Sequence, residues 1–488
     1  MREKMNTQRT YAIINDLLTK QSEKDWIEFK HNNNDAVMIG KKISALANAA
    51  SLLDQPVAYL LWGIKDDTHK ALGTNFEPFI QTQSREPLIF WLTKRLKPNL
   101  DFRFETIDYE GHNLVLLTIP ATTTSPLEFE QTAYIRIGSA TPKLSDHPAK
   151  LSSLWTKIQS YVWESGTAAG FQTSDEVLQK LDYVSYFDLT KQPLPDNRKG
   201  ILEKLQADAI IMVDVGERWN ITNLGAILLA KSLKVFSLSI ARKAVRFIQY
   251  NGNNRAAKVV NRQEGDKGYA SGYQGLLQYI DNLLPRNEHI GQAFREEEPL
   301  YPEIAIRELV ANALIHQDMT VTGSGPMVEM FSDRLEITNP GKPLIEPRRF
   351  IDYPPRSRNE RLAALTRRMG ICEEQGSGID KVIAAAEIHQ LPPPDFQEKG
   401  EAVCVTLFAP RRFANMTPDE RVRACYQHAV LSFLSGNKMK NSTLCQRLGI
   451  DSKNSSQASV VIKQTLDEGL VKPADTNHPR SGYVPFWA

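Results

Sequence analysis

A run of small and polar residues, ESGTAAGFQTSD, begins at Glu164 and separates two long stretches that each carry strand and helix patterns. Such runs are typical of linkers between domains. The chain has 488 residues, more than a single hydrophobic core usually holds, so three or four domains are expected. We predict an α/β multidomain protein with segments at 1–150, 175–290, 291–412 and 415–488.

The composition is that of a globular protein, with 41% hydrophobic and 24% charged residues. No apolar run approaches the roughly 18 residues that cross a membrane. The first residues lack the apolar core of a signal peptide, and the four cysteines are scattered without metal-binding or disulfide spacing. We therefore expect a reduced, cytoplasmic protein with no membrane contact.

A net charge of +2 conceals two basic stretches. Residues 231–262 contain eight Lys and Arg and no acid, and residues 411–488 contain eleven Lys and Arg against six acids. Clustered cations attract phosphate backbones without regard to sequence, so both stretches are candidates for nucleic-acid contact. A solvated basic face is the alternative for each of them.

The first segment reads as mixed α/β. DWIEFK alternates in a way that predicts a strand, with Glu28 and Lys30 on one side. DAVMIGKKISALANAA has helical spacing, and the apolar run VAYLLWGI predicts a buried strand that ends at KDD. A hairpin should turn at Glu110-Gly111, and TAYIRIGSATPKLS predicts one more strand.

This order, EFK, amphipathic helix, apolar strand, GIKDD and YIRIGSAT, resembles the Schlafen/AlbA-type domain. The resemblance implies nucleic-acid binding and, as in the cleaving members, metal-dependent cutting of transfer or ribosomal RNA. Those members use two glutamates five residues apart and an aspartate after the next strand. The matching residues here are Glu23, Glu28 and Asp66.

The chemistry of cleavage fits such a set of acids. Mg²⁺ and Mn²⁺ take oxygen ligands and can activate water at a phosphodiester. Lys30, on the strand face of Glu28, could stabilise the phosphate by analogy with unrelated nucleases that carry a Glu-x-Lys motif. Acids at strand ends are also ordinary surface residues, many domains of this type bind without cutting, and Asp67 leaves the choice of aspartate ligand open.

A second candidate site lies in RELVANALIHQD, where Glu308, Asn312 and His316 are spaced i, i+4, i+8 and share one helix face. An asparagine in mid-helix is unfavourable for stability, so this polar stripe calls for a reason. We predict that the helix is packed on both flanks and that the stripe lines a cleft. A solvated helical stripe is the alternative.

The set RELVANALIHQD, DRLEITNPG and EEQGSGID resembles the GHKL ATPases, most closely the divergent branch found in RecG-like proteins and transcriptional regulators. The resemblance implies an α/β sandwich that binds ATP with Mg²⁺. Glu308 would activate water and Asn312 would carry the metal, with His316 on the same face. The turn that reads adenine and the glycines that approach phosphates correspond to Asn339, Gly341, Gly376 and Gly378. Asn339 replaces the usual aspartate and the glycine-rich lid is short, so we expect binding without turnover.

The last segment resembles a winged helix. Thr417 and Glu420 form a capping box, two later helices should stop at Gly449 and Gly469, and SGYVPFWA would form the wing. As a nucleic-acid-binding module, it would contact phosphates through Lys453, Lys463 and Arg480. A winged helix that binds protein is the alternative.

Together these features predict a metal-dependent, Schlafen-like endonuclease regulated by ATP, with RNA such as tRNA favoured over DNA. The resemblance would suit anti-phage defence or a stress response, and it allows a homo-oligomer. One competing hypothesis is a non-catalytic, DNA-binding transcriptional regulator with a GHKL-like sensor. Another is an ATPase whose other domains recruit partners.

Overall fold

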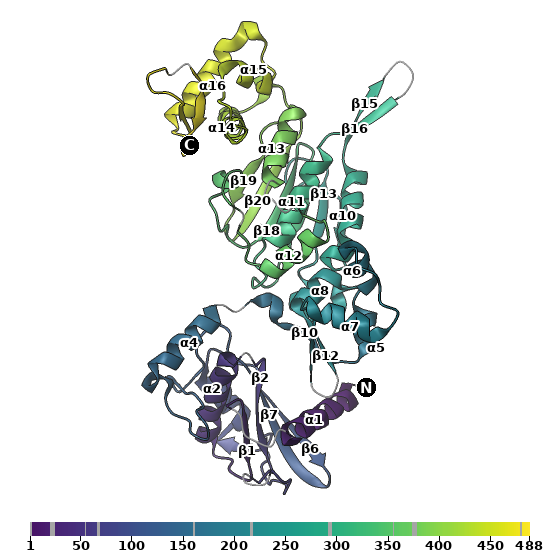
Figure 1. The fold of residues 1–488 in the computed structure, drawn as a ribbon, viewed down its shortest axis with the longest axis vertical. Coiled ribbons are helices and arrows are strands. Elements are labelled where there is room, and N and C mark those ends of the chain that lie inside the picture. The colour runs from purple at the N-terminus through teal and green to yellow at the C-terminus, as the bar shows by residue number, and fades with distance from the viewer. Residues whose placement is uncertain are drawn as a thin grey trace. The chain divides into compact units, whose positions relative to one another are not determined.

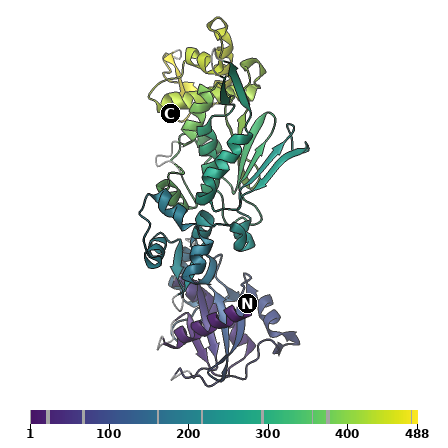
Figure 2. The same cartoon turned by 90° about the vertical axis from the view of Figure 1, so that its right-hand side faces the viewer.

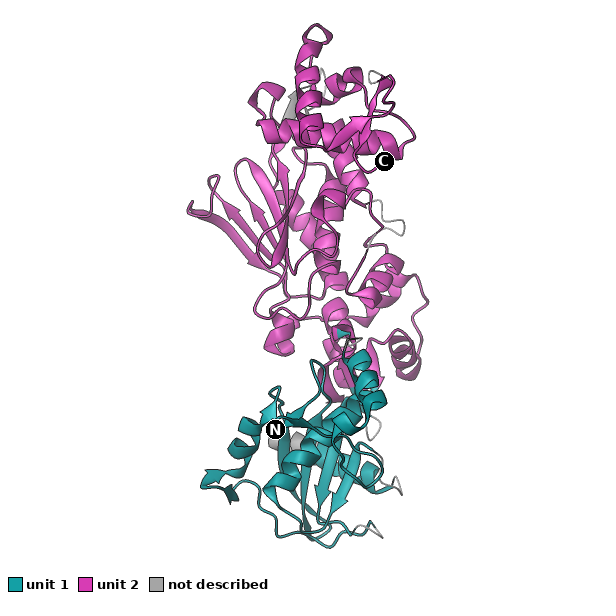
Figure 3. Cartoon of the chain, turned by 90° about the vertical axis from the view of Figure 1, so that its left-hand side faces the viewer, with its two compact units in different colours: residues 1–162, 213–219 teal, residues 163–212, 220–488 magenta. Residues whose placement is uncertain are grey.

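The computed structural model describes residues 2–19, 25–53, 55–65, 69–159, 162–214, 218–290, 295–354, 356–372, 378–478 and 481–488. The chain divides into two compact units, which Figure 3 colours separately. The first unit comprises residues 1–162 and 213–219, and the second comprises residues 163–212 and 220–488.

The first unit is built on a four-stranded sheet in the order β1-β2-β7-β6 (Figure 1). The first two strands are parallel because helix α2 crosses between them, and the remaining pairs are antiparallel. The hairpin between the last two strands turns at Glu110-Gly111, where both residues have positive φ, as predicted. The elements are β1 (Ile27–Lys30), α2 (Ala36–Leu52), β2 (Val57–Trp62), β6 (Arg103–Tyr109) and β7 (His112–Pro120).

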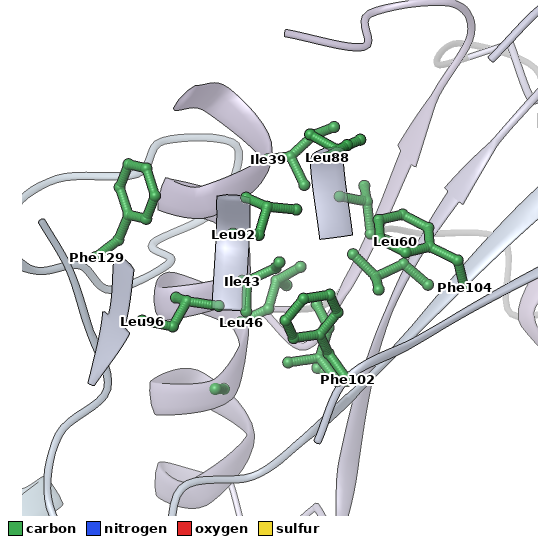
Figure 4. Packing of buried hydrophobic residues seen from close by; sticks show 14 of the residues in the cluster. Ile39, Ile43, Leu46, Leu60, Leu88, Leu92, Leu96, Phe102, Phe104 and Phe129 are labelled. Atoms are coloured by element: carbon green, nitrogen blue, oxygen red, sulfur yellow. The ribbon is translucent and has the colours of Figure 1, made fainter. Parts of the chain in front are cut away.

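Both faces of this sheet are buried, which explains the near-continuous apolar run of β2. Leu60 and Phe104 pack with α2 and α3 (Leu88–Arg95) in the core that Figure 4 shows. Leu61 and Leu116 face the other way and pack against α1 (Arg2–Thr19), a helix that the sequence patterns did not predict.

Short elements complete the first unit. The predicted strand TAYIRIGSATPKLS is wrong in extent, because only Thr132–Ala133 is a strand and single bridges continue to a turn at Gly138. The remaining elements are β3 (Thr82–Gln83), β4 (Glu86–Pro87), β5 (Leu96–Lys97), β8 (Glu128–Phe129), β9 (Thr132–Ala133), η1 (Leu144–Asp146) and α4 (Pro148–Gln159).

The predicted linker lies next to the boundary between the two units, after Val162, but the prediction of an unstructured segment is wrong. Residues 167–172 form β10, which pairs with β12 in a three-stranded sheet, and Thr173 caps the next helix with a capping box. The following elements are η2 (Trp163–Ser165), β10 (Thr167–Gln172), α5 (Ser174–Lys180), α6 (Tyr183–Thr190), α7 (Arg198–Ala207), β11 (Ile211–Val213), β12 (Trp219–Thr222), α8 (Asn223–Leu229), η3 (Leu233–Val235) and α9 (Leu238–Ala241).

A six-stranded sheet in the order β14-β13-β17-β18-β20-β19 forms the body of the second unit. It takes in two strands from the predicted connecting region, and long helices cover one of its faces (Figure 2). Its elements are β13 (Arg246–Tyr250), β14 (Val259–Glu264), α10 (Tyr269–Leu283), α11 (Glu303–Ile315), β17 (Met327–Met330), β18 (Arg334–Pro340), η4 (Pro347–Arg349), α12 (Glu360–Arg368), α13 (Gly378–Ile388), β19 (Asp395–Glu398) and β20 (Ala402–Phe408). A separate hairpin consists of β15 (Arg286–Ile290) and β16 (Arg295–Pro299).

The last segment forms three helices and a two-stranded sheet. The capping box at Thr417 and the helix stops at Gly449 and Gly469 are confirmed. This element order suits a winged helix, which stays a prediction. The elements are η5 (Phe413–Asn415), α14 (Pro418–Leu434), α15 (Asn441–Leu448), η6 (Ser452–Asn454), α16 (Ser455–Asp467), β21 (Val471–Pro473) and β22 (Tyr483–Pro485).

The chain thus has the mixed α/β multidomain fold that the patterns predict. Within the described ranges, no helix is both long and apolar enough to span a lipid bilayer.

Candidate functional site: a cavity in the second unit

A cavity of about 800 Å³ lies between α11, the strands β18 and β20, and the segment from Lys342 to Arg367. The predicted residues Glu308, Asn312, His316, Asn339 and Gly378 all line it. Five residues that the sequence assigned to one site are thus brought to one cavity from helix α11 and its C-terminal end, strand β18 and the start of helix α13.

Helix α11 presents its polar stripe to this cavity. Both flanks are packed, as predicted, because Leu309 and Ala313 are buried on one side of the stripe and Ala311 on the other, and Glu308 itself is only 2% exposed. The helix ends at Ile315, and the backbone N–H of His316 donates to the carbonyl oxygen of Asn312 at 2.9 Å. Burial lowers the pKa of His316, so its neutral form is favoured at neutral pH.

The start of helix α13 approaches Glu308 closely. A Cβ atom added to Gly378 would lie 2.7 Å from Oε2 of Glu308 and 3.8 Å from Nδ2 of Asn312. The glycine leaves room for this carboxylate at the start of the helix, and a larger residue would require the end of the Glu308 side chain to shift.

The opposite wall comes from the end of strand β18. Asn339 is 7% exposed and pairs in register with Val403 of β20. Gly341 follows with φ of +105°, and an added Cβ would lie 2.5 Å from the Cβ of Asp318. Gly341 does not line the cavity, and its absent side chain instead allows the turn after β18 to close over Asp318.

Basic side chains also line the cavity. Among the described lining residues there are four cations and two acids, Glu308 and Glu360, a balance that suits an anionic ligand. These cations are Lys342, Arg356, Arg358 and Arg367. The arginine-rich run RSRNERLAALTRR was the available signal for three of them.

Asn359 and Glu164 do not line the cavity but fix the start of helix α12, which lies beside these cations. The Asn359 amide donates to the carbonyl oxygens of Ile315 and Gln317 at 2.7 and 2.8 Å, which ties the α12 start to the α11 end. Glu164 accepts the N–H of Leu362 at 2.5 Å and so caps helix α12. Burial raises the pKa of Glu164 even though these backbone N–H groups oppose the shift.

Of the three acids predicted for the N-terminal site, Glu28 alone lies among the described residues. Glu23 and Asp66 lie outside the described residues, as do Gly376 and Arg480. Glu28 is 1% exposed on β1, and its Oε1 lies 2.9 Å from Lys30 Nζ and 2.7 Å from Lys42 Nζ. Its other oxygen pairs with the guanidinium of Arg136.

Both oxygens of Glu28 therefore face cations, and a divalent metal at Glu28 would have to displace them at a high electrostatic cost. The described contacts do not fit a metal ion at this carboxylate. Lys30, predicted to meet a phosphate, instead pairs with Glu28. Across the ranges that the structure covers, no group of three or more His, Cys, Asp or Glu side chains is arranged to hold a metal.

Of the three phosphate contacts predicted for the C-terminal segment, Lys453 and Lys463 lie among the described residues. Lys453 lies in η6 and Lys463 on helix α16, and both are exposed. The buried side of that helix carries Ala458, Val461 and Ile462, so Lys463 points away from the core.

Comparison with known protein families confirms both resemblances over part of the chain. Residues 23–145 match the family "Schlafen, AlbA_2", and residues 323–407 match the family "Putative ATP-dependent DNA helicase recG C-terminal". The second match includes Asn339 and Gly378 and begins after helix α11, so it does not reach Glu308 or Asn312.

Among solved structures, the chain is similar to the DIP2311 protein from Corynebacterium diphtheriae. The two are 16% identical with a TM-score of 0.41, over 99% of this chain and 97% of the other. No curated protein sequence matches the chain.

Proposed function

We propose that this protein binds nucleic acid and that a nucleoside triphosphate, ATP in the first instance, regulates the binding from the cavity of the second unit. The observation that carries the proposal is the cavity itself, where Glu308, Asn312, Asn339 and Gly378 converge beside four cations. Schlafen/AlbA-type and RecG-like domains on one chain point to a nucleic-acid-related function.

The cavity fits a nucleoside triphosphate in size and chemistry. Its volume of about 800 Å³ lies within the usual range of ligand sites. Apolar side chains such as Ile337, Val403 and Val405 suit a base, and the cations suit phosphates. The amide oxygen of Asn312 is a ligand that Mg²⁺ accepts, and the metal would neutralise phosphate charge there.

One route from the cavity to the C-terminal helices runs through the segment 347–353. Phe350 and Tyr353 line the cavity. Between them Ile351 packs into the core of the C-terminal helices, and the hydroxyl of Tyr426 donates to the carbonyl oxygen of Arg348 at 3.2 Å. A ligand that moves either aromatic ring must therefore move a segment that contacts α14.

A second route is helix α13, which begins at Gly378 in the cavity. Near its other end Glu387 lies 3.0 Å from Nδ1 of His428 on α14 and 3.3 Å from Nε of Arg447 on α15. Because a helix moves as a rigid element, a shift of α13 at Gly378 would also shift its contacts with the C-terminal helices.

Calorimetry tests the nucleotide site. We expect ATP with Mg²⁺ to bind the full chain, and Asn312→Ala to weaken the Mg²⁺-dependent part of the binding by about tenfold. Binding of equal strength in both proteins would refute the role of Asn312, and no binding to the wild type would refute the nucleotide site.

A second candidate function is the metal-dependent endonuclease. The match to the Schlafen AlbA_2 family favours it, because that match begins at Glu23 and spans Glu28 and Asp66. The ion pairs of Glu28 with Lys30 and Lys42 argue against this function, because they occupy the carboxylate that would bind the metal. Incubation of labelled tRNA and DNA with Mg²⁺ or Mn²⁺, with and without ATP, decides the question, since a chain that cleaves neither is not a nuclease on these substrates.

A further inference from the structure

Strand β14 is one edge of the six-stranded sheet, and no strand in the described ranges pairs with its outer side. Val259 and Val260 are 45% and 55% exposed, and Arg262 and Glu264 are exposed as well. An edge strand of this kind presents unpaired backbone N–H and C=O groups with which another strand can pair.

A hydrogen bond at the end of the β13–β14 pair shows which backbone groups are free. The N–H of Gly265 donates to the carbonyl oxygen of Val245 at 2.7 Å. The backbone groups of successive residues in an antiparallel strand point alternately to its two sides. Gln263 therefore faces β13, and Arg262 and Glu264 direct their N–H and C=O groups outward.

The opposite edge of the same sheet is protected against such pairing. Strand β19 has four residues and directly follows three prolines, Pro392–Pro394. Short strands and prolines are devices that keep the edges of sheets from pairing. Strand β14 has six residues and no proline, so the sheet is open to a further strand at this edge.

We propose that β14 pairs with β14 of a second copy of this chain, antiparallel and about a two-fold axis at Gln263. The inference concerns assembly and does not rest on the proposed nucleotide site. The charges of the strand itself point to this occupant. With the axis at Gln263, Arg262 of each copy lies opposite Glu264 of the other, and these are the residues whose backbone groups face outward.

The same charges select this register over its neighbours. Opposite charges that face each other across two strands stabilise the pair, and like charges destabilise it. Arg246 lies beside Glu264 on β13, so each Glu264 would lie between two arginines, one from each copy. An axis at Arg262 or at Glu264 would set that residue against itself. An axis at Asn261 would run the pairing through the bulge next to Tyr250.

Sedimentation equilibrium of the full chain measures the association. We expect the wild type to dimerise and Arg262→Glu to weaken the dimer by about tenfold or more, because two pairs of like charges then face each other. Arg262→Glu combined with Glu264→Arg exchanges the charges and should restore most of the affinity. Lys199→Glu, the same charge reversal at an exposed site on α7, is the matched control and should dimerise as the wild type does.

Disulfide formation locates the axis. The two residues at position 263 would form a non-hydrogen-bonded pair, whose Cα atoms lie about 4.5 Å apart, within the range of a disulfide. Gln263→Cys should therefore give a covalent dimer on oxidation. Asn261→Cys is its control and should not, because the two residues at position 261 would lie roughly 14 Å apart along the strands. The wild type, with its native cysteines, gives the background.

A wild type that stays monomeric at every concentration would overturn the inference and leave the edge to a strand of a different protein. A dimer that Arg262→Glu does not weaken would place the contact on another surface and would overturn it as well. A cross-link through Asn261→Cys in place of Gln263→Cys would refute the register. If Arg262→Glu fails to fold, the two cysteine variants decide.

Discussion

The carboxylate of Glu308 meets the first residue of helix α13, so that a Cβ atom at Gly378 would lie 2.7 Å from its Oε2. The two residues are far apart in the sequence and form one wall of the cavity. Helix α13 thus begins beside Glu308, and near its far end Glu387 contacts His428 of α14 and Arg447 of α15.

Gly378→Ala should weaken ATP binding by about tenfold, because the added methyl group must push the Glu308 carboxylate out of its place. Gly275→Ala is the matched control, since a Cβ at this α10 position meets nothing within 4 Å and alanine favours a helix. Calorimetric titration of both variants with ATP checks the prediction. Equal affinity in the two would show that the Glu308 contact does not shape the site.

Glu28→Gln should destabilise the chain by about 3 kcal/mol or more, because it removes the anion shared by Lys30, Lys42 and Arg136 and leaves buried cations uncompensated. Glu130→Gln, which breaks an exposed pair with Arg95, should cost about 0.5 kcal/mol or less. Urea denaturation gives both values.

If the two variants were equally stable, Glu28 would be a replaceable surface acid and its ion pairs would carry no structural role. The stability of the Glu28 variant must also be known before a cleavage assay is interpreted. A loss of activity in that variant points to a catalytic role only if the variant is folded.

Asp380→Asn should stabilise the chain above pH 6. Burial, reinforced by the neighbouring Asp352 carboxylate, raises the pKa of Asp380 to about 6, above its value of about 4 in an unfolded chain. The protonated carboxyl thus contributes stability that is complete below about pH 4 and is lost as the pH rises through about 6. At pH 8 the variant should gain about 1 kcal/mol, since partial exposure screens the effect.

Urea denaturation at pH 4 and pH 8 provides the measurement. The gain should vanish at pH 4, where the wild-type carboxyl is neutral as well. The exposed Asp101→Asn is the control and should follow the wild type at both values. An equal gain at pH 4 would mean that the amide, and not the lost charge, stabilises the variant.

Arg349→Ala should uncouple the C-terminal helices from the nucleotide. The guanidinium of Arg349 lies 5.0 Å from the ring of Trp487 and also holds Asp352, so it joins the segment 347–353 to the end of the chain. We expect ATP to change hydrogen exchange in residues 418–488 of the wild type and to change it much less in Arg349→Ala. ATP affinity should stay within about threefold.

Arg421→Ala is the matched control for this experiment, because Arg421 also packs over a ring, that of Phe413, and lies on α14 away from the cavity lining. It should keep the nucleotide response. A response that persists in Arg349→Ala would rule out the segment 347–353 as the main route.

Helical spacing was sufficient to predict that Glu308, Asn312 and His316 face one cavity, because the i, i+4, i+8 pattern fixes a face whatever the helix packs against. Strand alternation likewise placed Glu28 and Lys30 on one side, and the two side chains do meet. The remaining partners of Glu28 are Lys42 and Arg136, which come from a helix and from a distant loop. No local pattern could have shown that they surround it.

Tertiary structure overrode local signals elsewhere. Helix α1 was missed because its sequence is mostly polar; its described apolar residues that pack in the core of the sheet are Ile13, Ile14 and Leu17, with Tyr11 and Leu18 partly buried beside them. The small residues after Glu164 form a strand because β12 offers a partner, which composition does not reveal. The cations Lys342 and Arg356 reach the cavity from a loop path that depends on the whole fold.

The proposed function requires that nucleotide binding changes the affinity of the protein for nucleic acid. Fluorescence anisotropy of labelled tRNA and of labelled duplex DNA, at one fixed salt concentration, measures that link with and without ATP and Mg²⁺. We expect the nucleotide to change the dissociation constant of at least one nucleic acid by about fivefold or more in the wild type, and to leave it unchanged in Asn312→Ala. Equal dissociation constants with and without bound nucleotide, on both nucleic acids, would contradict the proposal.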